Sequence, residues 1–124
     1  MSWGQDFLNE HVGFLTQRDF DGLIKHHYHD DAELVTFEFV KQGAAAIRQY
    51  LAVEQPAKSG PILGMTMDAY YESDDVIIFT ASVKSQNLGT FIARDALYVK
   101  DGKVLRHIAL TLPPEKDKKI YQAM

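Results

Sequence analysis

Residues 91–112, FIARDALYVKDGKVLRHIALTL, decide the fold because they predict a β-hairpin. Apolar residues recur at alternate positions in both halves of this stretch, which is typical of β-strands. Asp101-Gly102 separates the halves, and this dipeptide favours a two-residue type I′ turn, in which both residues have positive φ. The stretch therefore predicts two long antiparallel strands joined by a tight turn.

A tight turn also predicts the register of the hairpin, and the register divides its side chains between two faces. The predicted pairs are Val99 with Val104, Leu97 with Arg106, and Asp95 with Ile108. One face is then expected to carry Phe91, Ala93, Asp95, Leu97, Val99, Ile108 and Leu110, and the other Ile92, Arg94, Ala96, Tyr98, Leu105, His107 and Ala109. Both faces are largely apolar, so the sheet needs a cover on each side. We expect helices on the first face and a second subunit on the other, a homodimer contact made by Arg94, Ala96, Tyr98 and His107.

Asp95 is the most informative single residue, because it is a carboxylate in mid-strand on an apolar face. An unpaired carboxylate in such a place is costly, so Asp95 needs a partner, a raised pKa or access to a wet cavity. One interpretation makes it an acid, a base or a hydrogen-bond donor in a cavity. The other pairs it with Arg106 across the hairpin as a structural ion pair, and the sequence keeps both open.

Composition indicates one globular domain over residues 1–124, with 46% hydrophobic and 24% charged residues. A net charge of −4 without a basic patch argues against a nucleic-acid partner. The chain has no cysteine, which excludes disulfides and thiolate metal sites. It begins without a signal-peptide pattern and has no apolar run of membrane-spanning length, so we expect a cytoplasmic protein with no membrane partner.

The order of the predicted elements favours an α+β fold with helices and strands largely segregated along the chain. A curved, mainly antiparallel sheet wrapped around helices would leave a conical cavity. The predicted helices are 5–17, a second one capped by Asp19 that ends near residues 29–31, and 44–54; the predicted strands are 32–39, 62–71, 76–84, 91–99 and 104–112, with turns or connections at 40–43 and 55–60 and a loosely ordered tail at 113–124.

Four local phrases in this order resemble the nuclear transport factor 2-like superfamily, and within it the SnoaL-like and ketosteroid-isomerase-like proteins. They are Asp19-Phe20-Asp21-Gly22-Leu23, Tyr28-His29-Asp30-Asp31-Ala32, Gly43-Ala44-Ala45-Ala46-Ile47-Arg48, and Arg94-Asp95 with Asp101-Gly102-Lys103-Val104. The resemblance covers residues 7–112 and implies the cystatin-like cone fold. It does not select one activity, since the superfamily holds isomerases, cyclases, dehydratases, hydrolases and binders without catalysis.

The ketosteroid isomerases within that superfamily use three residues, and the resemblance implies where each falls in this chain. Their late-strand aspartic acid falls on Asp95, and their first-helix tyrosine falls on His11. Their base falls near Thr36, where Glu38 is the nearest carboxylate. Only one of the three residue types is retained, which argues against ketosteroid isomerase activity itself but leaves another reaction in the same cavity open.

His11 and Asp95 are the predicted catalytic residues, acting as an acid–base dyad if the two side chains touch. The alternative for His11 is a core histidine bonded to a backbone carbonyl. The predicted ligand-binding residues, which we expect to meet the core or the cavity wall, are His27, Tyr28, Phe91, Leu97 and Ile108.

The run His26-His27-Tyr28-His29-Asp30-Asp31 contains many metal-ligating residue types but not the spacing of a metal site. Neighbours on a helix point in different directions, and no pair of histidines stands four residues apart. We therefore predict no metal, with His26 and His29 on the surface. His107 is expected on the outer face, away from Asp95, unless a bulge turns the strand over.

Three functions remain open from the sequence. The first is a cofactor-free isomerase-, cyclase- or dehydratase-like enzyme that exchanges protons with an apolar, carbonyl-bearing small molecule through His11 and Asp95. The second is a non-catalytic module that binds a small hydrophobic ligand, and the third is a dimerisation domain. Whether the protein is an enzyme is left open by the sequence.

Overall fold

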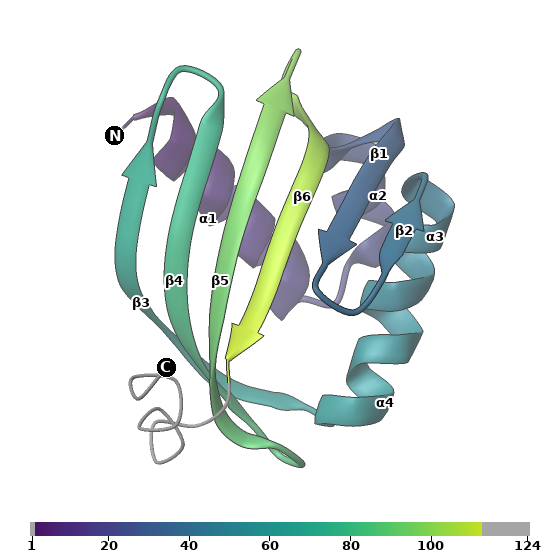
Figure 1. Ribbon diagram of the computed structural model, residues 1–124, viewed down its shortest axis with the longest axis vertical. Coiled ribbons are helices and arrows are strands. Elements are labelled where there is room, and N and C mark those ends of the chain that lie inside the picture. Colours follow the sequence, from purple (N-terminus) through teal and green to yellow (C-terminus); the bar gives the residue numbers. More distant parts are fainter. Residues whose placement is uncertain (1, 113–124) are drawn as a thin grey trace.

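The computed structural model describes residues 2–112, which form one sheet and a set of helices (Figure 1). The helices are α1 (Trp3–Thr16), α2 (Phe20–His27), α3 (Ala44–Gln49), the π-helical η1 (Tyr50–Glu54) and α4 (Gln55–Ser59). The strands are β1 (Tyr28–Thr36), β2 (Val40–Gln42), β3 (Ile62–Glu72), β4 (Val76–Ser85), β5 (Gly89–Lys100) and β6 (Lys103–Leu112). The tail predicted at 113–124 lies outside the described residues.

The six strands form one curved sheet in the order β2-β1-β6-β5-β4-β3. All neighbouring strands are antiparallel except β1 and β6. Figure 1 shows the helices behind one face of the sheet, with α1 crossing behind the long strands and α2 behind β1. We call this helix-covered side the inner face and the opposite side the outer face. The predicted α+β class and mainly antiparallel sheet are confirmed.

Helix α2 begins as predicted but ends earlier than predicted. The Asp19 side chain caps it by accepting a hydrogen bond from the Gly22 N–H at 2.9 Å. The helix stops at His27, and Tyr28 is already extended, with φ −125° and ψ 137°. Tyr28 instead pairs with Val104 of β6, so non-local strand pairing overrides the local helical pattern.

The segment after β1 also differs from the prediction. Residues 40–42, predicted as a turn, form the short strand β2 and pair with β1. The helix predicted to end at 54 continues through η1 and α4 to Ser59. Pro56 is the second residue of α4 and directly follows the π-helical turn, so it does not end the helix.

The β5–β6 hairpin has the predicted turn but a different register beyond it. Asp101 and Gly102 have φ of 53° and 80°, and Val99 pairs with Val104, as predicted. A bulge then leaves Leu105 without an opposite residue. The next pairs are Tyr98–Arg106, Leu97–His107 and Asp95–Ala109, so the predicted pairs Leu97–Arg106 and Asp95–Ile108 are wrong. His107 therefore moves to the inner face and Ile108 to the outer face.

Buried apolar residues on the inner face form two clusters. The larger lies between the helices and the sheet and includes Leu8, Leu23, Tyr28, Ala32, Leu34, Ile47, Ile77, Leu97, Val99 and Val104. The smaller consists of Ala81, Val83 and Phe91, with Phe79 and Ala93 packed against it. Met65 and Met67 pair with Val83 and Ala81 and stay 42% and 40% exposed. This end of the inner face is thus apolar and, among the described residues, only partly covered.

Candidate functional site

Asp95 lies on the inner face, between its strand neighbours Phe79 and Ala109. Its Oδ1 is 2.7 Å from Nε2 of His107, and the two side chains are 13% and 10% exposed. The bulge at Leu105 makes this contact possible, because it puts His107 on the same face as Asp95. The mid-strand carboxylate therefore has a partner, and a small part of it stays open to solvent.

Tyr28 extends this contact into a row of three polar side chains. Its hydroxyl oxygen is 3.0 Å from Nδ1 of His107. Because a carboxylate only accepts hydrogen bonds, Nε2 of His107 donates to Asp95, and in the tautomer with its proton on Nε2 the Nδ1 atom accepts from the Tyr28 hydroxyl. Burial, and next the charge of Asp95, raise the pKa of Tyr28 far above its usual range, so the hydroxyl keeps its proton and remains a donor.

A second row joins His11 and His27 to the exposed Glu10. Nδ1 of His11 is 3.2 Å from Nδ1 of His27, and Nε2 of His27 is 3.1 Å from Oε1 of Glu10. The carboxylate fixes the proton of His27 on Nε2, so His11 donates from Nδ1 to the free Nδ1 of His27. The Glu10 side chain is 61% exposed, whereas both histidines are buried.

Both buried histidines are held neutral by their surroundings. Burial lowers the pKa of His11 well below its usual value, and the neighbouring His107 and His27 lower it further. Burial also lowers the pKa of His27, although the hydrogen bond to Glu10 partly opposes this. The rings of His11 and Tyr28 lie 5.9 Å apart between centroids, so the two rows are neighbours inside the core.

The structure changes the partners that the sequence predicted for Asp95. Its hydrogen bond comes from His107, while the hydrogen bond of His11 goes to His27. The alternative ion pair with Arg106 is wrong, because Arg106 lies on the outer face and binds Glu33 at 3.2 Å. The predicted place of His107 in the outer interface is also wrong, because the bulge turns that part of β6 over.

The predicted ligand-binding residues do not lie together in the structure. Leu97, His27 and Tyr28 are core residues, and Phe91 belongs to the smaller apolar cluster on the inner face. Ile108 is 47% exposed on the outer face, so its predicted place beside Asp95 is wrong. Of this set, Phe91 is the residue nearest to the partly covered end of the inner face.

The histidine-rich run does not converge on one point. His26 is exposed and stacks on Phe14, whereas Nε2 of His29 bonds the carbonyl of Lys100 at 2.6 Å. Asp30 and Asp31 are exposed on β1. Within residues 2–112, no three His, Asp or Glu side chains gather in a way that could hold a metal ion.

Tyr50 is a site candidate that sequence reasoning missed. It begins the π-helical segment η1 and packs on Phe39, with 4.7 Å between ring centroids. Burial raises its pKa, and the charges of Glu38, Glu54 and Asp95 add to the effect, so Tyr50 lies within electrostatic range of Asp95. Glu38 itself is exposed in the β1–β2 turn. Single π-helical turns recur at functional sites but have no local sequence signal.

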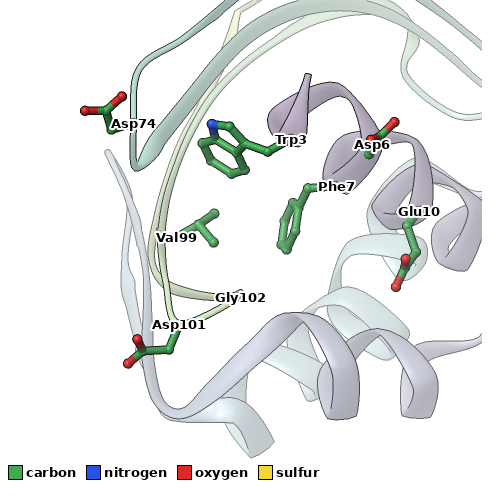
Figure 2. Close-up of a pocket in the computed structure, with 8 residues that line it drawn as sticks. All are labelled: Trp3, Asp6, Phe7, Glu10, Asp74, Val99, Asp101 and Gly102. Atoms are coloured by element: carbon green, nitrogen blue, oxygen red, sulfur yellow. The ribbon is translucent and has the colours of Figure 1, made fainter. Parts of the chain in front are cut away.

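A pocket of about 400 Å³ lies elsewhere, at the N-terminal end of α1 (Figure 2). It opens between that helix and the β3–β4 and β5–β6 turns, and none of the predicted site residues lines it. Its lining residues are Trp3, Asp6, Phe7, Glu10, Asp74, Val99, Asp101 and Gly102. The Asp95–His107–Tyr28 row and this pocket are therefore two separate candidate sites.

No protein-family model and no curated protein matches this sequence. Solved structures match it over nearly the whole chain. A putative SnoaL-like polyketide cyclase from Shewanella putrefaciens has a TM-score of 0.77, with 15% identity over 100% of this chain and 88% of its own. An NTF2-like protein of unknown function from Cytophaga hutchinsonii has a TM-score of 0.71 and 10% identity over 98% and 96% of the two chains.

A third similar structure is that of TerC co-crystallised with polyporic acid, with a TM-score of 0.72 and 21% identity over 98% of this chain and 97% of that one. At these identities the comparisons show the fold alone. The chain has the NTF2-like, SnoaL-like fold, as the sequence resemblance implied. Separately, no helix within the described part of the chain is long and apolar enough to span a membrane.

Proposed function

Starting from the NTF2-like fold, we propose that this protein is a cofactor-independent acid–base enzyme of the isomerase or polyketide-cyclase kind. Its substrate is an apolar small molecule with a carbonyl group, bound at the partly covered end of the inner face. The observation that carries the proposal is the hydrogen-bonded row Tyr28–His107–Asp95, whose carboxylate end is 13% exposed. A buried row that ends in an accessible carboxylate is suited to proton transfer.

In the proposed reaction, the carboxylate of Asp95 removes a proton from the carbon next to the substrate carbonyl. The C–H electron pair moves into an enolate, and Asp95 becomes a carboxylic acid. In an isomerisation this acid returns the proton to another carbon. In a cyclisation the enolate carbon forms a C–C bond with a second carbonyl carbon, and the proton goes to the alkoxide that results.

His107 and Tyr28 are positioning residues in this proposal. The Nε2–H of His107 holds one carboxylate oxygen, and the Tyr28 hydroxyl fixes the tautomer that allows this. Tyr50 supports the proposal as a neutral hydroxyl within electrostatic range of Asp95, suited to donate to an enolate oxygen. Phe91, Met65 and Met67 would contact the apolar body of the substrate.

The second candidate is a ligand-binding module without catalysis. The low exposure of Asp95 and His107 favours it, because a carboxylate that is 13% exposed can accept one hydrogen bond from a ligand more readily than it can shuttle protons. The similar structure co-crystallised with polyporic acid supports small-molecule binding by this fold. In this role Asp95 would orient the ligand.

Proton abstraction is tested by isotope exchange. A panel of apolar ketones is incubated with the protein in D₂O, and loss of the α-hydrogen signal is followed by NMR. We expect catalysed exchange for at least one ketone, lowered about 100-fold or more in Asp95→Asn. The control is Asp68→Asn, at an exposed carboxylate of β3 that bonds Ser82.

The outcomes separate the two candidates. Exchange that is equal in the wild type and in Asp95→Asn contradicts the enzyme proposal. Ligand binding that is lost in Asp95→Asn, without exchange in either protein, supports the binding module instead. No binding and no exchange by any ketone contradicts both.

A further inference from the structure

The pocket at the N-terminal end of α1 is separate from the proposed reaction, and its chemistry is distinctive (Figure 2). We propose that it binds an organic cation with an apolar body, such as a protonated aryl-alkylamine. The proposal rests on a pocket of about 400 Å³ whose walls are aromatic and whose charged lining residues are all acidic. It does not depend on any activity at Asp95.

The apolar walls of the pocket are held in place by the surrounding fold. Figure 2 shows the side chains of Trp3, Phe7 and Val99 on three sides of the hollow. Nε1 of Trp3 donates to the Ser73 carbonyl at 3.2 Å, which fixes the indole to the β3–β4 turn. Phe7 stacks on His27 with 4.0 Å between centroids. Fixed aromatic rings of this kind attract cations through their π faces.

The charged lining residues favour a ligand with a positive charge. Asp6 and Glu10 come from α1, and Asp74 and Asp101 from the two turns. Lys100 and Lys103, which flank the β5–β6 turn, are not among the lining residues. Figure 2 shows the carboxylates of Asp74 and Asp101 at the margin of the pocket, directed away from its apolar walls. The Glu10 carboxylate bonds His27. The four charges act on the ligand at this distance, through a negative potential that favours a cation over a neutral or anionic ligand.

The spacing of these carboxylates argues against a metal ion. Within residues 2–112, no three acidic or histidine side chains converge closely enough to hold one. Charges spread around an aromatic pocket fit a bulky monocation, whose positive charge is diffuse and whose body fills apolar space. The aromatic walls and the carboxylates come from different elements and select the same class of ligand independently.

Trp3 makes this proposal directly measurable, because it is the chain's only tryptophan and it lines the pocket. Its fluorescence is followed while protonated 2-phenylethylamine is added, and 2-phenylethanol serves as a neutral probe of similar shape. We expect the fluorescence change to saturate with the amine, at a half-saturation concentration about ten-fold lower than that for the alcohol. Equal half-saturation concentrations for the two probes overturn the proposal, and so does the absence of a saturable change with the amine.

A charge-matched pair of double variants tests the site. Asp74→Asn with Asp101→Asn removes two charges from the lining, and asparagine tolerates the positive φ of residue 101. Glu38→Gln with Asp68→Asn removes two charges elsewhere. We expect the first double variant to bind the amine about ten-fold more weakly and the second to bind it within about two-fold of wild type. Equal weakening in both overturns the proposal, because it would mean attraction to net charge alone; if the first variant fails to fold, the wild-type comparison of amine and alcohol still decides.

Discussion

His107 contacts Asp95 only because Leu105 is accommodated in a bulge. The sequence placed Asp95 on the inner face, since β5 alternates regularly and its turn has a recognisable dipeptide. It could not place His107, because a bulge is stabilised by the packing of both faces and has no local signature. The hydrogen-bond partner of Asp95 could therefore be identified from the structure but not from the sequence.

The Tyr28 hydroxyl is expected to stabilise the fold through His107. Tyr28→Phe removes the donor to Nδ1 of His107 and leaves this buried nitrogen without that hydrogen bond. We expect the free energy of unfolding in urea to fall by about 1–2 kcal/mol. The control is Tyr71→Phe on the outer face, where the side chain is 70% exposed and a change near zero is expected. Equal effects in the two variants would contradict the role assigned to Tyr28.

His11 and His27 give the folded state a specific pH dependence. Because their pKa values are lowered on folding, the unfolded chain binds more protons below its histidine pKa of about 6.5. Their contribution to stability is complete above about pH 6.5 and is lost as the pH falls toward the lowered pKa values, by at most about 1.4 kcal/mol per pH unit for each histidine.

This dependence is measured by urea unfolding between pH 7.5 and about pH 5, a range set by the histidine pKa. His11→Gln is expected to reduce the loss of stability over that range. His26→Gln, at an exposed histidine, is expected to leave the loss as in the wild type. A pH dependence of stability that is unchanged in His11→Gln would show that His11 is not held neutral by burial.

Elements with strong local signals were predictable, and elements made by non-local contacts were not. Helix α1, the cap of α2 and the four long strands follow from apolar periodicity, Asp19 and turn residues. Strand β2 and the start of β1 at Tyr28 exist because of pairing with distant strands. The helix predicted over 44–54 was found, but its π-helical turn at residues 50–54 has no local signal, and its continuation over residues 55–59 was missed because Pro56 suggested an end.

The contact between α1 and α2 depends on Gly22. A Cβ at this position would meet the Asp19 carboxylate, and Phe14 Cε1 at 2.8 Å, whereas a Cβ at Gly13 would meet nothing within 4 Å. We expect Gly22→Ala to lower the free energy of unfolding by about 1–3 kcal/mol through overpacking. Gly13→Ala should raise it by about 0.5–1 kcal/mol, because alanine is the better helix former. Thermal and urea unfolding of both variants check this, and stabilisation by Gly22→Ala would refute the close contact.

At the scale of the whole molecule, the outer face carries an unbroken row of apolar residues across all six strands. They are successive strand partners: Tyr71, Ile78, Ala96, Ile108, Val35 and Val40. We propose that a second copy of the chain covers this row, in a dimer that uses Arg94, Ala96 and Tyr98 as the sequence predicted. Ile108 takes the place in this face that was predicted for His107.

Ala96→Glu puts a charge in the middle of this row. We expect the variant to run as a monomer in analytical ultracentrifugation where the wild type runs as a dimer, because an unpaired charge in an apolar interface is costly. Ala45→Glu on the exposed side of α3 is the matched control and should leave the dimer intact. A dimer that survives Ala96→Glu would exclude this face as the interface.

The bulge at Leu105 also has a genetic consequence. Loss of that single codon would let β6 pair continuously with β5 in the register that it already has, with Val104 opposite Val99 and Arg106 opposite Tyr98. His107 would still point inward and Ile108 outward. The bulged residue can thus be lost without separating the histidine from its aspartate and without turning any later side chain of the strand to the other face.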